Sequence, residues 1–389
     1  MPALFFAYDF PVFMAATYCR RGAKFWMDEP GNDDNALMGL AREAVDVALA
    51  GDIKRGLSMA LDARHRARSA GDSHAELAAL NATARCHSLR NDSIASLSVG
   101  IDAATLAQKL GDRLALAHAL CAIANTAFTL QLLEESIDIS ARAVEDSMLL
   151  RDNDLECRAR QVYGVILGDL KRFGEAREQL HLALAAAERD GRLSLQYRVQ
   201  GNLASLSRKE ARFHAASGDE LRMQAACSAA LAAASSLVER AKPQKLYSLE
   251  MNMTSLAGEI HGLQGDIDSA VNETRLAIEL AARARQPSNI PPAALRLAKL
   301  LQSRGELTDA LAVLKGGLAA AETLRPTFRI AELCEMIGSI EEQRGDAATA
   351  SSWQQRAAVE RQSFAAERQI AAGYMRKLNA EIAAATGGV

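Results

Sequence analysis

The sequence predicts an all-α fold, a right-handed α-solenoid of about eight helix hairpins that ends in a long C-terminal helix. Three observations lead to this prediction: turns at a fixed spacing, small residues that recur in step with those turns, and long stretches without proline. A single hairpin cannot bury its apolar face alone, so a solenoid needs copies of the hairpin stacked along the chain.

Turns that combine glycine with an acidic residue recur at intervals of 40 residues in two series. The first series is Gly265-Asp266, Gly305-Glu306 and Gly345-Asp346, and the second is Gly71-Asp72, Gly111-Asp112, Arg151-Asp152 and Gly191. This constant spacing predicts repeated pairs of helices. One pair, about Leu193 to Ala241, carries an insertion around residues 213–221 that lengthens its hairpin.

The stretch from Gln161 to Gly191 shows how one pair is built. Its small residues, which let two helix backbones approach closely, are Gly164, Ala176 and Ala183. Its larger apolar residues, which fill the surrounding space, are Leu167, Phe173 and Leu180. Other pairs repeat the small residues in register: Ala84, Ser96, Ala103; Ala124, Ser136, Ala143; Gly258, Ala270, Ala277; Ala298, Ala310, Gly317; Gly338, Ala350, Ala357.

This arrangement resembles the tetratricopeptide repeat (TPR), and the resemblance covers roughly residues 36 to 364. The long period and the long last helix also look like the TPR sensor regions of bacterial signalling proteins, in some of which a helix leads into a diguanylate cyclase domain. No GGDEF motif occurs in this sequence. The resemblance therefore implies a sensor or adaptor without a catalytic output domain.

Composition agrees with a helical chain that has one continuous core. Apolar residues make up 49% of the sequence, and no proline lies between Pro30 and Pro243. Proline breaks helix interiors, so this gap favours helices throughout. Later prolines, at Pro243, Pro287 and Pro326 among others, fall at expected junctions between pairs.

Charge and cysteine usage restrict the partners and the compartment. The formal net charge is −3 and charges of both signs are mixed, which gives no general electrostatic case for nucleic acid or for an anionic membrane. We find no apolar run of the roughly 18 residues that a membrane span needs. Six scattered cysteines without a CxxC pair predict reduced, buried thiols in a cytoplasmic protein.

Three regions follow from the pattern: an atypical segment 1–35, a TPR solenoid 36–364 and a C-terminal helix 365–389. In the first region the basic cluster follows the apolar part, which is the reverse of a signal peptide. We expect translation to start at Met27, or residues 1–26 to be a disordered tail. A helix under the first repeat and a targeting segment are the alternatives.

The C-terminal helix carries an apolar stripe at four positions, Ile370, Tyr374, Leu378 and Ile382. Such a stripe must cover another apolar surface. We expect a capping helix that folds back over the last repeat. The alternative is a coiled coil that joins two copies into a homodimer.

Catalytic and metal-binding patterns are not found in the sequence. Gly164 and Gly168 lie inside a predicted helix rather than after a strand, which excludes a phosphate-binding loop. No HxxxH, HExxH or GxSxG spacing occurs. We therefore expect no enzyme activity, no metal and no cofactor.

A binding groove remains as the functional candidate. In TPR proteins the first helix of each pair lines a concave groove, and we expect the groove positions to lie six and three residues before the small residue of that helix, and one and four after it. Applied to this chain, the rule gives Asn81, Arg85, His118, Asn125, Phe128, Arg158, Gln161, Arg198, Arg208, Asn252 and Glu259.

Arginine recognises carboxylates with a forked set of donors, and asparagine can pair with the backbone of an extended peptide. The predicted function is a non-catalytic scaffold or adaptor that binds a protein or peptide, preferably an acidic one, in bacterial signalling or regulation. A peptide-pheromone or small-ligand sensor and a structural assembly subunit are the alternatives. The Lys and Asn set of the chaperone-tail clamp of TPR proteins is incomplete here.

Overall fold

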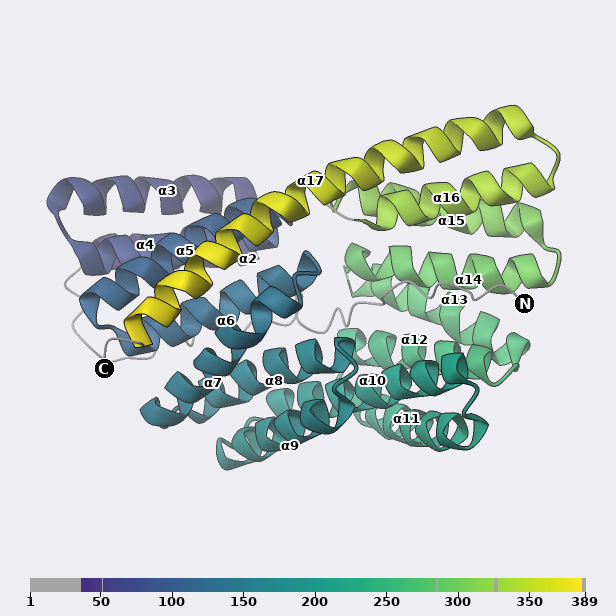
Figure 1. Cartoon of the computed structure of the whole chain (residues 1–389), viewed down its shortest axis with the longest axis horizontal. Coiled ribbons are helices and arrows are strands. Elements are labelled where there is room, and N and C mark those ends of the chain that lie inside the picture. The colour runs from purple at the N-terminus through teal and green to yellow at the C-terminus, as the bar shows by residue number, and fades with distance from the viewer. Residues whose placement is uncertain (1–35, 51, 285, 325–327, 387–389) are drawn as a thin grey trace. The chain divides into compact units, whose positions relative to one another are not determined.

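The structure is a computed structural model that describes residues 36–50, 52–284, 286–324 and 328–386. All regular secondary structure in these residues is helical, and sixteen α-helices form eight consecutive hairpins (Figure 1). The all-α hairpin solenoid predicted from the sequence is confirmed. The atypical segment 1–35 lies outside the described residues.

Contacts divide the chain into two compact units. Within the described part, the first unit contains the residues up to Leu170, His181–Gly191 and the chain from Glu367 onward, and the second contains Lys171–Leu180 and Arg192–Ala366. The helices of the first unit are α2 (Ala36–Leu49), α3 (Ile53–Ala70), α4 (Ser73–Leu89), α5 (Ser93–Leu110), α6 (Arg113–Thr129), α7 (Ile137–Leu150) and α8 (Asn153–Asp169), with a 3₁₀ turn η1 (Glu134–Ser136).

Helix α9 (Phe173–Arg189) contributes to both units. The second unit continues with α10 (Leu193–Ser217), α11 (Glu220–Ala241), α12 (Tyr247–Leu263), α13 (Ile267–Arg283), a 3₁₀ turn η2 (Pro287–Asn289), α14 (Ile290–Ser303), α15 (Leu307–Glu322) and α16 (Arg329–Gln343). Helix α17 (Ala347–Thr386) also belongs to both units. The predicted insertion takes the form of two extended helices, because α10 has 25 residues and α11 has 22.

Short turns at a spacing of 20 residues set the helix lengths. One residue with positive φ follows each of the seven helices α3 to α9, at Gly71, Asn91, Gly111, Gln131, Arg151, Lys171 and Gly191. Glycine reaches this left-handed conformation without strain, which explains the glycines in the sequence pattern. Aspartates begin many of the next helices by accepting a hydrogen bond from a backbone N–H, as Asp72 does from Ala75 at 2.9 Å.

The core consists of apolar side chains between adjacent helices. Alanines such as Ala44, Ala60 and Ala63, all fully buried, allow close packing at the start of the solenoid. In the second unit, Leu314 and Ile337 are fully buried in a cluster that joins α13 to α17. Burying one such side chain stabilises the fold by about 1.5–3 kcal/mol.

The C-terminal part of helix α17 does not fold back as a cap over the last repeat, as the sequence predicted. The helix runs for 40 residues without a break, and the part after Glu367 packs within the first unit (Figure 1). Arg368 donates to the carbonyl oxygen of Gln131 at 3.0 Å, and Asn379 donates to that of Glu135 at 3.0 Å. The Thr105 hydroxyl donates to Glu381 at 3.4 Å.

The buried face of α17 is also shifted from the predicted stripe. Ala371, Met375 and Leu378 are at most 2% exposed, whereas Ile370 and Tyr374 are 53% and 38% exposed. Ile382 is half-buried. A shift of one residue turns a helical stripe by about 100°, so only the second half of the predicted stripe faces the protein. A homodimer through the remaining exposed residues stays a prediction.

One described helix, α11, is long and apolar enough to span a membrane by length and composition. Helix α11 does not stand out as an apolar run in the sequence, because it is rich in alanine and interspersed with Gln and Ser. Its face of Met223, Cys227, Ala230 and Leu237 is buried against α10 and α12 in the core of the second unit.

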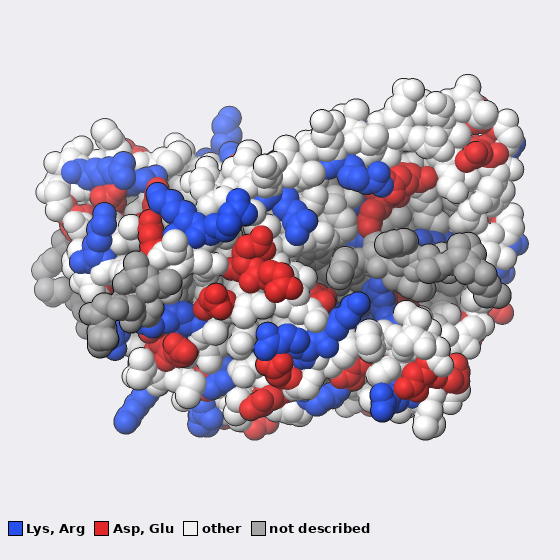
Figure 2. Space-filling view, viewed as in Figure 1, with Lys and Arg blue, Asp and Glu red and all other residues white. Residues whose placement is uncertain are grey.

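On the face of the molecule seen in Figure 2, basic and acidic side chains are intermixed.

Candidate functional site

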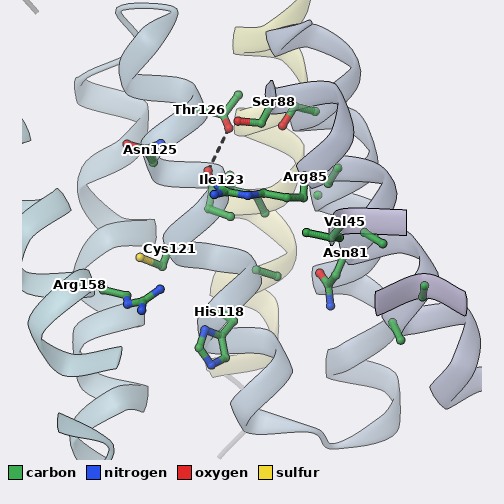
Figure 3. A pocket seen from close by; sticks show the side chains of 18 of the residues that line it. Val45, Asn81, Arg85, Ser88, His118, Cys121, Ile123, Asn125, Thr126 and Arg158 are labelled. Atoms are coloured by element: carbon green, nitrogen blue, oxygen red, sulfur yellow. Dashed lines mark hydrogen bonds between the residues drawn. The ribbon is translucent and has the colours of Figure 1, made fainter. Parts of the chain in front are cut away.

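A cavity of about 160 Å³ lies within the first unit, among helices α2, α4, α5, α6 and α8. Four of these are the first helices of their pairs, as predicted for a groove. Figure 3 shows Asn81 and Arg85 reaching in from α4, His118 and Asn125 from α6, and Arg158 from α8. The structure thus brings five of the predicted groove residues together.

The repeat register explains why these side chains meet. Residues 40 apart occupy equivalent places on successive first helices, and four such sets line the cavity. The sets are Met38, Ala78, His118 and Arg158; Ala41, Asn81 and Cys121; Arg42, Ala82 and Ala122; and Val45, Arg85 and Asn125. Because each helix presents positions i, i+3, i+4 and i+7 on one face, these sets form parallel rows across adjacent helices.

The cavity carries positive charge. Arg42, Arg85 and Arg158 line it, and none of the lining residues in the described part of the chain is Asp or Glu. The carboxylate of Asp154, one turn earlier on α8, lies 2.7 Å from the Arg158 guanidinium. Both partners are buried, so this ion pair fixes the direction in which Arg158 points.

His118 is neutral at physiological pH. Burial, together with the smaller effect of the neighbouring Arg158 guanidinium, lowers the pKa of His118 to about 3. A neutral imidazole offers one N–H donor and one acceptor, and it adds no charge to the cavity. A general base titrates near the operating pH, so this histidine is poorly suited to proton transfer.

Asn125 supplies a polar group that is ready for a ligand. Its Oδ1 atom is buried and accepts no hydrogen bond from the residues that the structure describes. An unsatisfied buried acceptor costs roughly 1–3 kcal/mol. A ligand N–H placed in the cavity would remove this cost.

Two predicted groove residues of the first unit do not line the cavity. Phe128 is only 4% exposed, and Gln161 is 2% exposed and donates to the Cys157 sulfur at 3.1 Å. The position four after the small residue lines the cavity on α4 but not on α6 or α8, and the position three before it lines the cavity on α2, α4 and α6 but not on α8. A groove role for these two residues stays a prediction.

The other predicted residues lie in the second unit. Arg208 of α10 pairs with Glu259 of α12 at 2.5 Å. Arg198 is buried on α10, and Asn252 is half-buried on α12. The predicted groove residues therefore lie partly in the first unit and partly in the second.

Sequence reasoning missed Arg42 and Arg296. Both lie two residues before the small residue of their helix, a position that the groove rule left out. Arg42 lines the cavity, and Arg296 contacts Glu259 at 3.0 Å. Adding this position to the register would have identified both.

Within the described part of the chain, no group of three His, Cys, Asp or Glu side chains is arranged to hold a metal ion. Cys86, Cys121, Cys157, Cys227 and Cys334 are free and buried, as predicted for reduced thiols, and Cys19 lies outside the described residues. The site offers hydrogen bonds and positive charge, which suit binding.

Solved structures with the same architecture include the apo form of RapI, with a TM-score of 0.60 at 12% sequence identity, covering 75% of this chain and 100% of that one. A Rap protein complexed with competence and sporulation factor has a TM-score of 0.59 at 13% identity and covers 92% and 96% of the two chains. The Rap conjugation gene regulator of plasmid pLS20, in complex with the Phr* peptide, has a TM-score of 0.54 at 13% identity and covers 86% and 97%.

At these identities the likeness concerns the fold, and it confirms a TPR-like helical-hairpin solenoid. No family model and no curated protein matches the chain.

Proposed function

We propose that this protein is a non-catalytic regulatory adaptor that binds the carboxylate end or an acidic side chain of a peptide in the cavity of the first unit. The observation that carries the proposal is the lining itself, which contains three arginines and no acidic residue among the residues that the structure describes. A guanidinium binds a carboxylate through two parallel N–H donors, which gives both energy and direction.

The remaining polar groups suit the segment next to such a carboxylate. Asn125 Oδ1 can accept a backbone N–H, and the neutral His118 can donate or accept without repelling a cationic neighbour. Of the structures with the same fold, one is a complex with competence and sporulation factor and one is a complex with the Phr* peptide. This supports a peptide as the ligand, in agreement with the prediction from the sequence.

The cavity volume favours a second candidate, a sensor for a small carboxylic acid. A volume of about 160 Å³ is close to that of engineered protein cavities that hold one benzene molecule. It therefore accommodates one or two side chains or a small metabolite, while the rest of a peptide would lie outside it.

A matched pair of synthetic peptide libraries tests the proposal. Randomised decapeptides with a free carboxylate, and the same library as amides, are incubated with the protein, and retained peptides are identified by mass spectrometry. We expect retention of the free acids. For a retained peptide, Arg85→Gln with Arg158→Gln should weaken binding by about 30-fold or more, which corresponds to roughly 2 kcal/mol.

Arg90→Gln is the control, because Arg90 caps α4 at the surface and pairs with Asp92 at 2.5 Å, outside the cavity. Equal binding by the control, the double variant and the unmodified protein would show that the cavity is not the peptide site. If neither library is retained but small carboxylic acids raise the melting temperature in an Arg85-dependent way, the small-ligand function replaces the peptide function.

We also propose the finer assignments made from the sequence: a cytoplasmic location, which the five buried free thiols support, and a preference for acidic partners. The absence of catalysis is supported by the low pKa of His118, the histidine that lines the cavity. A homodimer, or a role as an assembly subunit, would use the exposed Ile370 and Tyr374.

A further inference from the structure

The cavity of the first unit reaches past the first helices to α5, which is the second helix of its pair. Ser96 and Gly100, one turn apart on α5, line the cavity together with Ile123 of α6. Helix α5 packs against both α4 and α6. We call Ser96, Gly100 and Ile123 the deep end of the cavity, because all three are buried and two of them belong to the helix behind α4 and α6.

Gly100 leaves a gap that other repeats fill with a side chain. It lies four residues after Ser96, the small residue that starts the register of its helix. The residues at the equivalent place in other second helices are each at most 1% exposed, and they are Ala60, Ser140, Leu180 and Leu314. A buried side chain therefore occupies this place in α3, α7, α9 and α15, whereas α5 has only a hydrogen atom there.

Close contact between helix backbones does not require this glycine. A Cβ added at Gly100 would lie 3.2 Å from Ile123 Cγ1 and 3.9 Å from Ile123 Cδ1, which belong to a side chain that can adjust. At Gly56, the small residue of α3, an added Cβ would instead collide with the backbone oxygen of Ala44. Gly56 thus lets two helices touch, whereas Gly100 opens space in front of Ile123.

Other lining residues suit an apolar group in this space. Ala82 and Ala119 line the cavity and are at most 4% exposed, and their methyl groups offer no hydrogen bonds. The Thr126 hydroxyl donates to the carbonyl oxygen of Ala122 at 3.0 Å, so its donor is used within α6 (Figure 3). An aliphatic group fits such surroundings, whereas a charged group would lose its hydration there.

We infer that the deep end is a subsite for one leucine-sized aliphatic side chain, so that the ligand is a carboxylate attached to a short branched aliphatic group. The inference rests on the carboxylate binding proposed above for this cavity. The repeat itself supplies the precedent, because Leu180 and Leu314 fill the equivalent place in α9 and α15. The same chemistry occurs in a peptide that ends in leucine and in a free acid such as 4-methylpentanoic acid.

Titration calorimetry on the full chain tests the subsite. Peptides of sequence Ser-Gly-Ser-Gly-X with a free carboxylate are compared, where X is glycine, leucine, asparagine or glutamate. Asparagine has nearly the shape of leucine but is polar. We expect the leucine peptide to bind at least about tenfold more tightly than the other three, because burial of an aliphatic side chain is favourable and burial of an unpaired polar one is not.

Free acids form the second arm of this experiment and identify the source of the ligand. If 4-methylpentanoic acid binds as tightly as the leucine peptide and acetic acid does not, the subsite serves a small branched acid. If the leucine peptide binds and 4-methylpentanoic acid does not, the subsite serves the C-terminus of a peptide.

Gly100→Ala tests where the selectivity arises. Alanine occupies the equivalent place at Ala60, so the repeat tolerates it, and circular dichroism confirms that the variant folds. We expect the affinity for the leucine peptide to fall about tenfold, while that for the glycine peptide stays within about twofold. Gly316→Ala is the matched control, because Gly316 is an exposed glycine inside α15, where an added Cβ meets nothing within 4 Å. It should leave both affinities unchanged.

Equal binding of all four peptides would overturn the subsite and leave the proposed carboxylate function standing. A preference for the glutamate peptide would also overturn it and would favour a cavity that selects acidic side chains. If no peptide and no free acid binds, the proposed function itself fails, and the subsite fails with it. If Gly100→Ala weakens the leucine and glycine peptides equally, the preference does not arise at Gly100, which contradicts the assignment.

Discussion

Two adjacent glycines in α15 show how tightly single positions are constrained. Gly317 is buried, and a Cβ added there would lie 2.5 Å from Ala294 Cβ and 3.3 Å from Leu333 Cδ2. Gly316 is exposed, and a Cβ there would meet nothing within 4 Å. The same residue type therefore serves close packing at one position and has no packing role at the next.

Substituting each glycine by alanine should change stability in opposite directions. Gly317→Ala forces α14 and α15 apart, and overpacking of this kind costs about 1–3 kcal/mol. Gly316→Ala should stabilise the protein by roughly 0.5–1 kcal/mol, because alanine is the better helix former. Urea unfolding measures both, and a Gly317→Ala variant as stable as Gly316→Ala would refute the packing argument.

Individual site residues were partly predictable from the sequence. The 40-residue register placed Asn81, Arg85, His118, Asn125 and Arg158 on one side of their helices, and the structure brings these side chains to one cavity. Arg42 was missed because the width of the inward face depends on how adjacent helices are rotated. That rotation follows from three-dimensional packing, which a spacing rule does not contain.

At the scale of elements, the sequence predicted which helices exist and how long they are better than it predicted which helices pack together. The turn series at intervals of 40 residues is observed as residues with positive φ between helices, including Gly265, Gly305 and Gly345. The long last helix was also expected. Its packing partner was not, because an amphipathic stripe indicates that a helix covers something without indicating what it covers.

The last part of α17 should be held to the first unit by its buried face. Met375 is fully buried there, so Met375→Ala should weaken the contact by about 2–5 kcal/mol. Hydrogen exchange should show faster exchange of the amides after residue 370, while amides of residues 347–360 in the same helix stay protected.

Ile370→Ala is the control for this experiment, because Ile370 lies on the same helix with 53% of its surface exposed. We expect its exchange pattern to match that of the unmodified protein. Faster exchange in Ile370→Ala but not in Met375→Ala would instead show that the helix face carrying Ile370 is covered, as a homodimer requires. Sedimentation would then show a concentration-dependent mass.

At the scale of the whole molecule, aspartate caps at helix starts are repeated along both units. Aspartate side chains accept a backbone N–H at the start of successive helices, at Asp52, Asp72, Asp92, Asp112, Asp152, Asp219, Asp266 and Asp346. Each such cap contributes about 1 kcal/mol in typical proteins. Since the same residue type recurs at many helix starts, protonation at low pH acts on many hairpins together.

Two of these caps show the direction of the pH dependence. Hydrogen bonds from Ser269 lower the pKa of Asp266, and hydrogen bonds from Thr349 lower that of Asp346, both from an ordinary value of 3.8. The folded state therefore releases the proton more readily than the unfolded state. This contribution to stability is present above pH 3.8 and is lost as the pH falls through the lowered values.

Replacing both aspartates with asparagine keeps the cap but removes its titration. We expect Asp266→Asn with Asp346→Asn to lose less stability than the unmodified protein when urea unfolding at pH 6 is compared with unfolding at pH 3. Asp62→Asn is the control, because Asp62 lies inside α3, where it pairs with Arg66 at 2.9 Å and caps no helix. If the double variant and this control lose the same stability as the unmodified protein, acid acts elsewhere, and the repeated caps do not set the pH limit of the fold.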